Sequence, residues 1–198
     1  MQLTHRETLV NRGSFTESDE YEAVNEDIVE AINAIAWPPG NDRFVIRPER
    51  NENGVSPIKD GFIQHLKGEA WRDEERLDIA VNKRPGPIDA VYEFDDGGYF
   101  AAEWETGNIS SSHRALNKMC VGIIEDTLKG GALILPSGNL YPYVTDRVGN
   151  YPELVPYFPV WKSLQVGEGY LGIYVVEHDE TDENVETIDK GTDGRALV

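Results

Sequence analysis

The chain has 198 residues and a mass of 22.2 kDa, enough for one compact domain with a sizeable core, so we expect a single domain over residues 1–198. The sequence has no apolar run long enough to span a membrane and no basic-then-apolar signal pattern at its start, which predicts a cytoplasmic protein. The single cysteine, Cys120, excludes an intrachain disulfide and a zinc site built from several thiolates.

The formal net charge of −18 at pH 7 argues against a nucleic-acid partner, because DNA-binding domains usually carry basic surfaces. The acidic residues are clustered, however. Residues 17–30 and 177–189 are rich in Asp and Glu and contain no Lys or Arg, whereas residues 106–124 contain Arg114 and Lys118 and no acidic residue. The negative charge therefore lies mainly outside the middle of the chain and does not exclude a polyanionic partner there.

Helical periodicity occurs twice in the first third of the chain. Apolar residues at steps of three and four predict a helix over residues 18–36, with acidic residues on its opposite face. A second helix is expected over residues 56–67, with Ser56 as its N-cap and Pro57 at its first position. A short strand is expected over residues 77–81.

Two segments in the middle of the chain predict a β-hairpin. Residues 88–94 and 99–106 are rich in β-branched and aromatic residues, and Asp95-Asp96-Gly97-Gly98 between them is a strong turn signal. The remaining expected elements are a helix over 111–128 closed by Gly130-Gly131, a strand over 132–135, helical or mixed structure to 165, a strand over 170–177 and a flexible acidic arm over 178–198. Strands that alternate with helices predict an α/β fold with a mixed sheet flanked by helices.

Three carboxylates are expected to converge on this hairpin. Glu103 and Glu105 are two residues apart in a strand, so they project from the same face, while Trp104 between them points to the opposite, buried face. Asp89 lies near the start of the partner strand, and the turn brings it opposite these glutamates. The predicted result is a cluster of carboxylates at one end of the sheet.

Such a cluster indicates a metal site. Carboxylates at close range repel each other, and a bound cation removes that penalty. Oxygen ligands favour hard ions, so we expect Mg²⁺, with Mn²⁺ able to substitute, in a site typical of phosphoryl transfer. An acidic solvent-facing strand is the favoured explanation of Glu103 and Glu105 when they are taken alone, but the apolar strand around them, YFAAEWET, favours the functional interpretation.

The segment that follows Glu105 is suited to reading DNA. It combines short polar side chains near a helix start with basic side chains one turn apart, namely Asn108, Ser110, Arg114 and Lys118. A helix N-terminus attracts phosphate, and in the major groove Asn can pair with adenine and Arg with guanine. Helix capping by serine and a solvated basic face are the alternatives. His113 and the serine before it are not expected to form a nucleophilic pair, because adjacent helix residues do not face each other.

Five strings of this chain resemble the BamHI-type family of type II restriction endonucleases. They are NGVSPIK (53–59), GPID (86–89), EWETGNISSSHRALNK (103–118), YPYVTDRVGNYPELVPYF (141–158) and KGTDG (190–194), in the family's order and approximate spacing. The resemblance implies the restriction-endonuclease-like PD-(D/E)XK core, a central mixed β-sheet flanked by helices on both faces. In this family a glutamate replaces the lysine of that motif, and Glu105 stands at the corresponding position.

The resemblance also implies roles for individual residues. By position, Asp89 and Glu103 would bind Mg²⁺ and Glu105 would be the general base. Glu74 matches a further acidic residue near the metal, but that match needs a two-residue gap before Asp89, and Glu75 remains an alternative. The expected readers of the major groove are Asn108, Ser110, Arg114, Asp146 and Arg147. Asp193 and Gly194, in the C-terminal arm, would reach the minor groove.

The implied activity is Mg²⁺-dependent cleavage of double-stranded DNA at a palindrome, GGATCC, by a homodimer, with a cognate DNA methyltransferase in the same cell. A two-fold protein suits a two-fold site. Two other hypotheses stay open. One is a nuclease of the same core with different or looser specificity, which would give other fragments or a smear. The other is a non-catalytic acidic protein that binds or mimics DNA, which would show no Mg²⁺-dependent cleavage.

Overall fold

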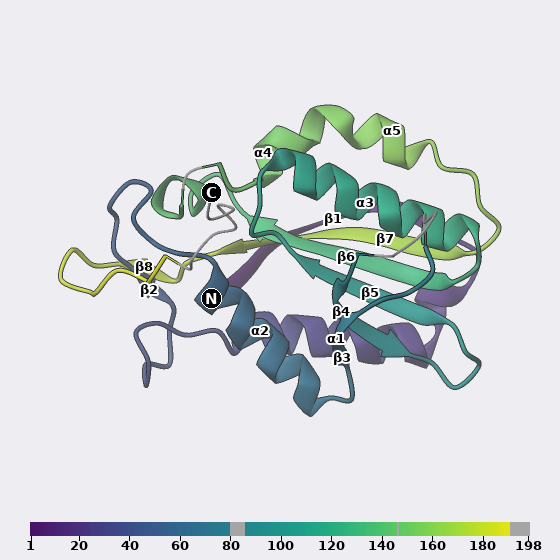
Figure 1. The fold of residues 1–198 in the computed structure, drawn as a ribbon, viewed down its shortest axis with the longest axis horizontal. Coiled ribbons are helices and arrows are strands. Elements are labelled where there is room, and N and C mark those ends of the chain that lie inside the picture. Colours follow the sequence, from purple (N-terminus) through teal and green to yellow (C-terminus); the bar gives the residue numbers. More distant parts are fainter. Residues whose placement is uncertain (80–85, 146, 191–198) are drawn as a thin grey trace, which may run out of the picture.

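The computed structural model describes residues 1–79, 86–145 and 147–190 (Figure 1). Its centre is a six-stranded sheet in the order β1-β7-β6-β5-β4-β3. The strands are β1 (Gln2–Arg12), β3 (Arg72–Glu75), β4 (Ile88–Glu93), β5 (Tyr99–Trp104), β6 (Leu128–Pro136) and β7 (Gly169–Glu177). The pairs β5–β6 and β6–β7 are parallel and the other three are antiparallel, so the predicted mixed sheet is confirmed.

Helices cover both faces of this sheet (Figure 1). One face carries α1 (Asp19–Asn33) and α2 (Ser56–Gly68), and the other carries α3 (Ile109–Ile124), α4 (Tyr151–Leu154) and α5 (Phe158–Lys162). Short 3₁₀ helices also connect these elements: η1 (Phe15–Glu17), η2 (Tyr141–Tyr143) and η3 (Val155–Tyr157). A small parallel sheet of β2 (Val45–Ile46) and β8 (Glu180–Thr181) lies apart from the main one. No helix in the described part of the chain has the length and apolar character needed to cross a bilayer.

Two hydrophobic cores lie on opposite sides of the sheet, and strand β7 contributes to both. Tyr170 and Tyr174 join the core under α1 and α2, whereas Leu171 and Ile173 join the core under α3 and α5. This follows from the alternation of side chains along a strand. Because both faces of β7 are buried, its sequence is a nearly continuous apolar run.

The predicted hairpin and the first helix are confirmed. Strands β4 and β5 pair with Ala90 opposite Ala102, and the chain turns between them. Ser18 is the N-cap of α1, its side chain accepting a hydrogen bond from the backbone N–H of Tyr21. Helix α1 ends at Asn33, earlier than expected. The predicted N-cap of α2 was wrong, because Val55 precedes the helix and Ser56 is its first residue.

The expected helix over 111–128 lies instead at Ile109–Ile124, and the two glycines expected to close it belong to strand β6. These glycines allow neighbouring side chains to approach the strand closely. A Cβ on Gly131 would lie 2.5 Å from the sulfur of Met119 on α3, and one on Gly130 would lie 2.7 Å from the ring of Phe100. Gly130 and Gly131 therefore allow a helix and an aromatic ring to pack directly on the strand.

Two polar edge strands differ from the expectation. The strand expected over residues 77–81 was wrong for 77–79, which have no regular structure, and 80–81 lie outside the described residues. The edge strands are β3, with the sequence RDEE, and β1, which buries only Leu9 and Val10. Both are largely exposed, so they lack the apolar alternation by which strands are predicted.

The described part of the expected C-terminal arm is packed against the body. Ile188 is buried, its carbonyl accepts a hydrogen bond from Gly54 N (2.8 Å), and its N–H donates to the side chain of Asn53 (3.2 Å). Asn53 in turn donates to the carbonyls of Arg47 and Tyr143 (3.0 and 2.9 Å). Asp193 and Gly194 lie outside the described residues.

Candidate active site

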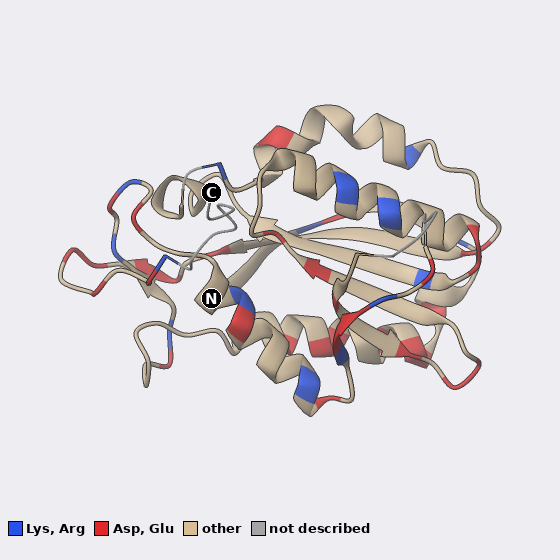
Figure 2. Cartoon of the chain, in the orientation of Figure 1, with Lys and Arg blue, Asp and Glu red and all other residues tan. Residues whose placement is uncertain are grey.

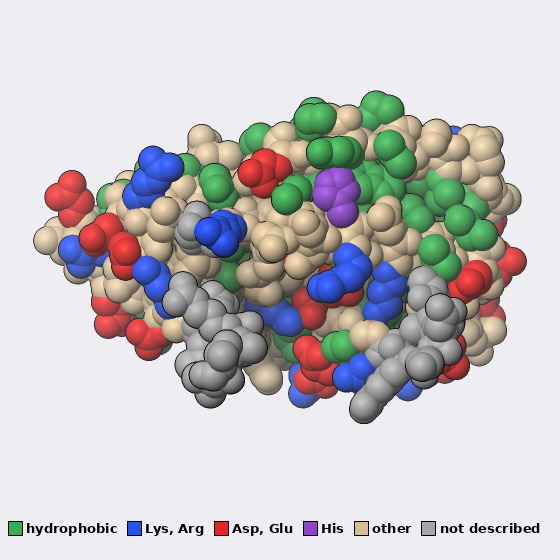
Figure 3. Space-filling model, turned by 45° about the horizontal axis from the view of Figure 1, so that its top comes forward, with side chains coloured by type: hydrophobic (Ala, Val, Ile, Leu, Met, Phe, Trp, Pro, Cys, Tyr) green, Lys and Arg blue, Asp and Glu red, His purple; other side chains and the backbone are tan. Residues whose placement is uncertain are grey.

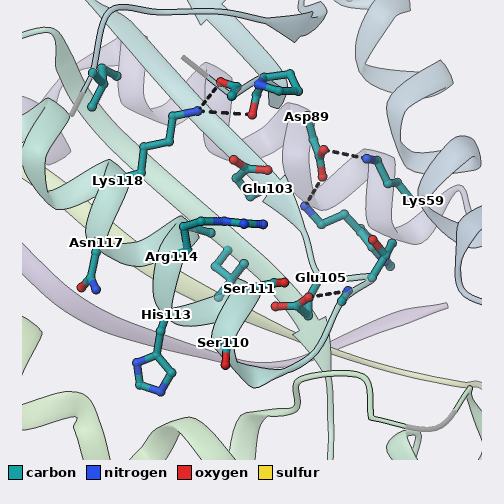
Figure 4. Close-up of a pocket in the computed structure, with 18 of the residues that line it drawn as sticks. Lys59, Asp89, Glu103, Glu105, Ser110, Ser111, His113, Arg114, Asn117 and Lys118 are labelled. Carbon is teal, nitrogen blue, oxygen red and sulfur yellow. Dashed lines mark hydrogen bonds and ion pairs between the residues drawn. The ribbon is translucent and has the colours of Figure 1, made fainter. Parts of the chain in front are cut away.

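A cavity of about 1020 Å³ opens between helix α3 and the ends of strands β4 and β5. The polar and charged side chains that line it include Lys59 of α2, Glu74 of β3, Asp89 of β4, Glu103 and Glu105 at the end of β5, and Ser110, Ser111, His113, Arg114 and Lys118 of α3. Figure 4 shows the labelled acidic and basic side chains of this cavity close to one another. The structure therefore brings the predicted acidic residues together in one cavity.

Asp89 is fixed by two hydrogen bonds. Its Oδ2 accepts from the backbone N–H of Trp104 (2.9 Å), and its Oδ1 accepts from the ammonium of Lys59 (2.6 Å) (Figure 4). The first bond crosses the hairpin, so the register of β4 and β5 places Asp89 beside Glu103, as the sequence predicts. The carboxylate thus has a defined orientation at the end of the sheet.

Glu103 lies on the cavity side of β5, whereas the Trp104 side chain packs on the opposite face, with its ring centroid 5.0 Å from that of Phe62. Burial, together with the negative charge of Asp89, raises the pKa of Glu103 to about 8; the positive charges of Lys118 and Lys59 act in the opposite direction. Glu103 is therefore a carboxyl whose ionised form needs a nearby cation.

Glu105 is the most enclosed of the acidic side chains, with 4% of its surface exposed. Its backbone N–H continues the parallel ladder to Ile134 O (2.8 Å), while its carboxylate accepts from Gly107 N (2.6 Å) and from the hydroxyl of Ser112. Burial raises the pKa of Glu105 to about 7, and these two hydrogen bonds act to lower it. The side chain is a buried carboxylate held at both oxygens.

A second segment closes over Glu105. The N–H of Gly149 donates to the carbonyl of Gly107 (2.9 Å), and a Cβ on Gly149 would lie 3.2 Å from Glu105 Oε2 and would overlap the hydroxyl of Ser112. Only a glycine leaves room for this contact. Since Gly149 follows Arg147 by two residues, the segment expected to read DNA rests on the loop behind Glu105.

Of the two acidic alternatives in strand β3, Glu74 is the one that lines the cavity. Its backbone has φ +52°, and its carboxylate lies 3.7 Å from the ammonium of Lys59. Glu75 lies instead 3.6 Å from Arg72. Lys59 is a site residue that none of the sequence patterns indicates, although it lies in one of the family-like strings, residues 53–59.

The donor chemistry of the cavity fits a hard divalent cation. Asp89, Glu103 and Glu74 offer oxygen ligands only, and the ammonium of Lys59, a positive charge, lies between Asp89 and Glu74. Over residues 1–79, 86–145 and 147–190, no three His, Cys, Asp or Glu side chains come close enough to hold an ion as they stand. One oxygen of Asp89 is bound instead by the ammonium of Lys59.

The residues expected to read DNA occupy helix α3 and the loop before it. Asn108 is the N-cap, its side chain accepting from Ser110 N (2.9 Å), so the capping role expected for a serine falls to asparagine. Arg114 lines the cavity. Lys118 also lines it and donates to the carbonyls of Gly86 and Pro87 (2.7 and 3.2 Å), which ties α3 to the segment that leads into β4.

The structure describes some of the other residues considered for this site. His113 packs its ring on Tyr157 and Trp161, with centroid distances of 4.4 and 5.3 Å, and not on a serine. Arg147 has a left-handed backbone conformation (φ +74°). Asp146 lies outside the described residues.

The charge distribution is uneven. Helix α3 carries only basic charged residues, whereas α1 and the loops around β8 are acidic (Figure 2). In the view of Figure 3, Lys and Arg side chains lie on both sides of a small group of Asp and Glu side chains near the centre of the face, and hydrophobic side chains lie above them. The net charge of −18 is therefore compatible with a locally basic surface beside the carboxylates.

Comparisons with known proteins agree with this architecture. The family model described as "Restriction endonuclease BamHI" matches residues 1–195. The chain is 48% identical to the type II restriction enzyme OkrAI of Oceanobacter kriegii over 197 residues, covering 100% of both chains. It is 36% identical to the type II restriction enzyme BamHI of Bacillus amyloliquefaciens over 181 residues, 87% of this chain and 82% of that protein.

The fold is also similar to that of restriction endonuclease BglII, solved in complex with a DNA 16-mer, with a TM-score of 0.57 and 10% identity over 94% of this chain and 90% of that chain. This likeness shows that the chain has the fold of a restriction endonuclease. The chain belongs to the BamHI family of restriction endonucleases, and it is a site-specific endonuclease.

We expect the metal-free protein to become less stable as the pH rises. In the folded state the pKa values of Glu103 and Glu105 are raised from 4.5 to about 8 and about 7, so the folded protein holds protons that the unfolded chain releases. The stability from these protons is complete below pH 4.5 and is lost as the pH rises through 7 and 8. Urea unfolding in EDTA from about pH 5 to about pH 9 measures the effect.

The Glu103→Gln variant is the control, because it removes one of these groups. We expect its free energy of unfolding to fall less across this range, by about 1 kcal/mol or more. His178, whose pKa is lowered by burial, acts in the opposite direction in both proteins and cancels in the comparison. Equal decline in the two proteins would show that Glu103 is ionised and solvated in the free enzyme.

Proposed function

We propose that this protein is a type II restriction endonuclease that hydrolyses double-stranded DNA at a palindrome, GGATCC, in a Mg²⁺-dependent reaction. The observation that carries the proposal is the convergence of Asp89, Glu103 and Glu105 in one cavity of a chain from the BamHI family. The particular palindrome rests on the likeness to BamHI, which is 36% identical to this chain.

Asp89 and Glu103, with Glu74, are the residues that would hold the divalent cation. When bound, Mg²⁺ stabilises charge on the phosphate and lowers the pKa of coordinated water. Mn²⁺, which also takes oxygen ligands, would substitute. A bound cation would compete with Lys59 for Asp89, and the Lys59 ammonium beside the cavity would add positive charge for the phosphate backbone.

Glu105 acts as the general base in this proposal. A water molecule attacks the phosphorus in line with the 3′ oxygen, Glu105 accepts the proton of that water, and the 3′ oxygen leaves. In the metal-free protein burial raises the pKa of Glu105 to about 7, and a divalent cation beside it would lower that pKa and favour the carboxylate that accepts a proton near neutral pH. Its closed surroundings also keep bulk water from competing for its oxygens.

Helix α3 and the segment around Arg147 face the bases. Asn108, Ser110, Arg114, Asp146 and Arg147 are the proposed readers, and the N-terminus of α3 lies at the cavity where a phosphate would approach. Lys118 holds the segment before β4 and adds positive charge. Asp193 and Gly194, from the C-terminal arm, would complete contacts in the minor groove. The enzyme would work in the cytoplasm beside a methyltransferase that protects the host's own sites.

A palindromic site calls for two copies of the chain related by a two-fold axis. The face formed by η3 and α5 is suited to that contact, because Val155, Tyr157 and Val160 leave 43%, 47% and 65% of their surfaces exposed. Such large apolar side chains clustered on one face mark a protein interface. We therefore propose that the homodimer forms through η3 and α5, beside α3.

The activity is tested with a plasmid that contains one GGATCC site. We expect a single linear product with Mg²⁺, none with EDTA, and none from a plasmid whose site is mutated. Asp89→Asn and Glu103→Gln should each slow cleavage at least about 100-fold while the protein still folds and binds DNA in Ca²⁺. A KCl series belongs to the test, because phosphate binding weakens steeply with salt.

Each outcome of that experiment decides between the hypotheses. Discrete fragments from other sites would indicate a different palindrome, and a smear would indicate a nuclease of looser specificity. A folded protein that cuts nothing at any salt concentration would be a binding protein or DNA mimic. Full activity in either variant would remove that residue from the site.

Base reading is tested at Arg147. Replacing it by alanine should cost about 1–3 kcal/mol of discrimination at one base pair, because a bidentate contact to a base edge is lost. The measurement compares cleavage rates on GGATCC and on the nine sites obtained by changing each of the three positions of one half-site to each of the other three bases. A uniform loss across all of them would indicate a phosphate contact, and an unchanged pattern would contradict any role in recognition.

Dimerisation is tested with Val160→Glu. A charge on the most exposed of the apolar side chains should lower the dimer fraction in sedimentation and convert double-strand cleavage to slow nicking. An unchanged dimer in the Val160→Glu protein would place the interface elsewhere.

A further inference from the structure

Ser112 is a buried polar residue in the apolar stripe of helix α3. It has 0% exposed surface and lies four residues before Leu116, on the face that also carries Met119 and Ile123. Alanine would fill such a position with better helix propensity and no polar atom to satisfy. A buried hydroxyl at this place therefore needs an explanation other than packing.

The hydroxyl of Ser112 has one acceptor among the described hydrogen bonds, the Oε2 of Glu105. A serine within a helix commonly bonds back to the carbonyl one turn earlier, which here belongs to Asn108. The hydroxyl is directed instead to a carboxylate seven residues away along the chain. Helix α3 thus donates a buried hydrogen bond to the side chain of Glu105.

The carboxylate of Glu105 is contacted at both of its oxygens. Its Oε1 is taken by Gly107 N (2.6 Å), and Gly149 closes the space beside Oε2 and the Ser112 hydroxyl. Of these contacts, only the one from Ser112 is made by a side chain. It is therefore the contact that a substitution can remove without changing the backbone.

We propose that Ser112 is a positioning residue for the cleavage reaction, holding Glu105 in the orientation in which it accepts the proton of the attacking water. The inference rests on the proposed function, in which Glu105 is the general base. Proton transfer requires heavy atoms within hydrogen-bond reach, and a displacement of about 1 Å can cost on the order of 100-fold in rate. Ser112 acts through Glu105 and does not touch DNA.

The experiment compares three variants with the wild type. Ser112→Ala removes the donor and little volume, and Ser112→Thr keeps the hydroxyl. Ser137→Ala removes a different buried hydroxyl, one that accepts from Asn139 N and Leu140 N (both 3.1 Å) and does not line the cavity. Single-turnover cleavage with Mg²⁺ and DNA affinity with Ca²⁺ are measured separately, well below the lowest unfolding midpoint of the set.

We expect Ser112→Ala to slow the single-turnover step roughly 10- to 100-fold while the DNA dissociation constant changes less than about twofold. Ser112→Thr should recover most of the rate, and Ser137→Ala should lower the unfolding midpoint without slowing cleavage. If Ser112 had a purely structural role, Ser112→Ala would lower the unfolding midpoint but would not slow the single-turnover step relative to DNA binding. Loss of affinity alone, an unchanged rate in Ser112→Ala, or no recovery in a folded Ser112→Thr would each overturn the inference.

A second measurement separates this inference from the proposed function. A crystal structure of the wild type should show the Glu105 side chain in one rotamer. A crystal structure of Ser112→Ala should show it in a different rotamer or in more than one. If the wild type does not cleave DNA, the proposed function fails and these structures alone decide whether Ser112 fixes Glu105. If the wild type cleaves and Glu105 is unmoved in Ser112→Ala, the positioning role fails while the nuclease remains.

Discussion

The repulsion between carboxylates buried at the end of one hairpin is the constraint on which the rest of the site depends. Asp89 and Glu103 are brought together by the register of β4 and β5, which the hydrophobic cores on both sides of the sheet hold in place. Without compensation this arrangement would be unfavourable by several kcal/mol. The compensation comes from the ammonium of Lys59, the N–H of Trp104, and protons retained by the glutamates.

This compensation explains how an acidic chain can carry a DNA-directed site. The charge of −18 is spread over α1, the loops and the C-terminal segment, while the cavity is bordered by Lys59, Arg114 and Lys118. Electrostatic attraction to phosphate acts over roughly a Debye length, about 10 Å at 0.1 M salt, so the local balance near the cavity matters more than the total. The acidic remainder opposes non-specific binding elsewhere on the surface.

The sequence predicted the hairpin, the mixed sheet and the meeting of Asp89 with Glu103, because alternation and a strong turn signal are local properties. It did not predict β1 and β3, since exposed edge strands carry no apolar pattern. The prediction that Gly130 and Gly131 end the helix was wrong, because these glycines allow close packing against residues that are distant in the sequence. Lys59 reaches Asp89 from 30 residues away, and no spacing within α2 indicates that contact.

The hydrogen bond between Gly149 and Gly107 has an evolutionary consequence. It joins the segment proposed to read bases to the loop that holds the proposed general base, through backbone atoms and with no room for a side chain. Substitutions that change recognition therefore have to preserve this contact. A replacement for the segment proposed to read bases that lost the contact would also disturb the loop that holds Glu105.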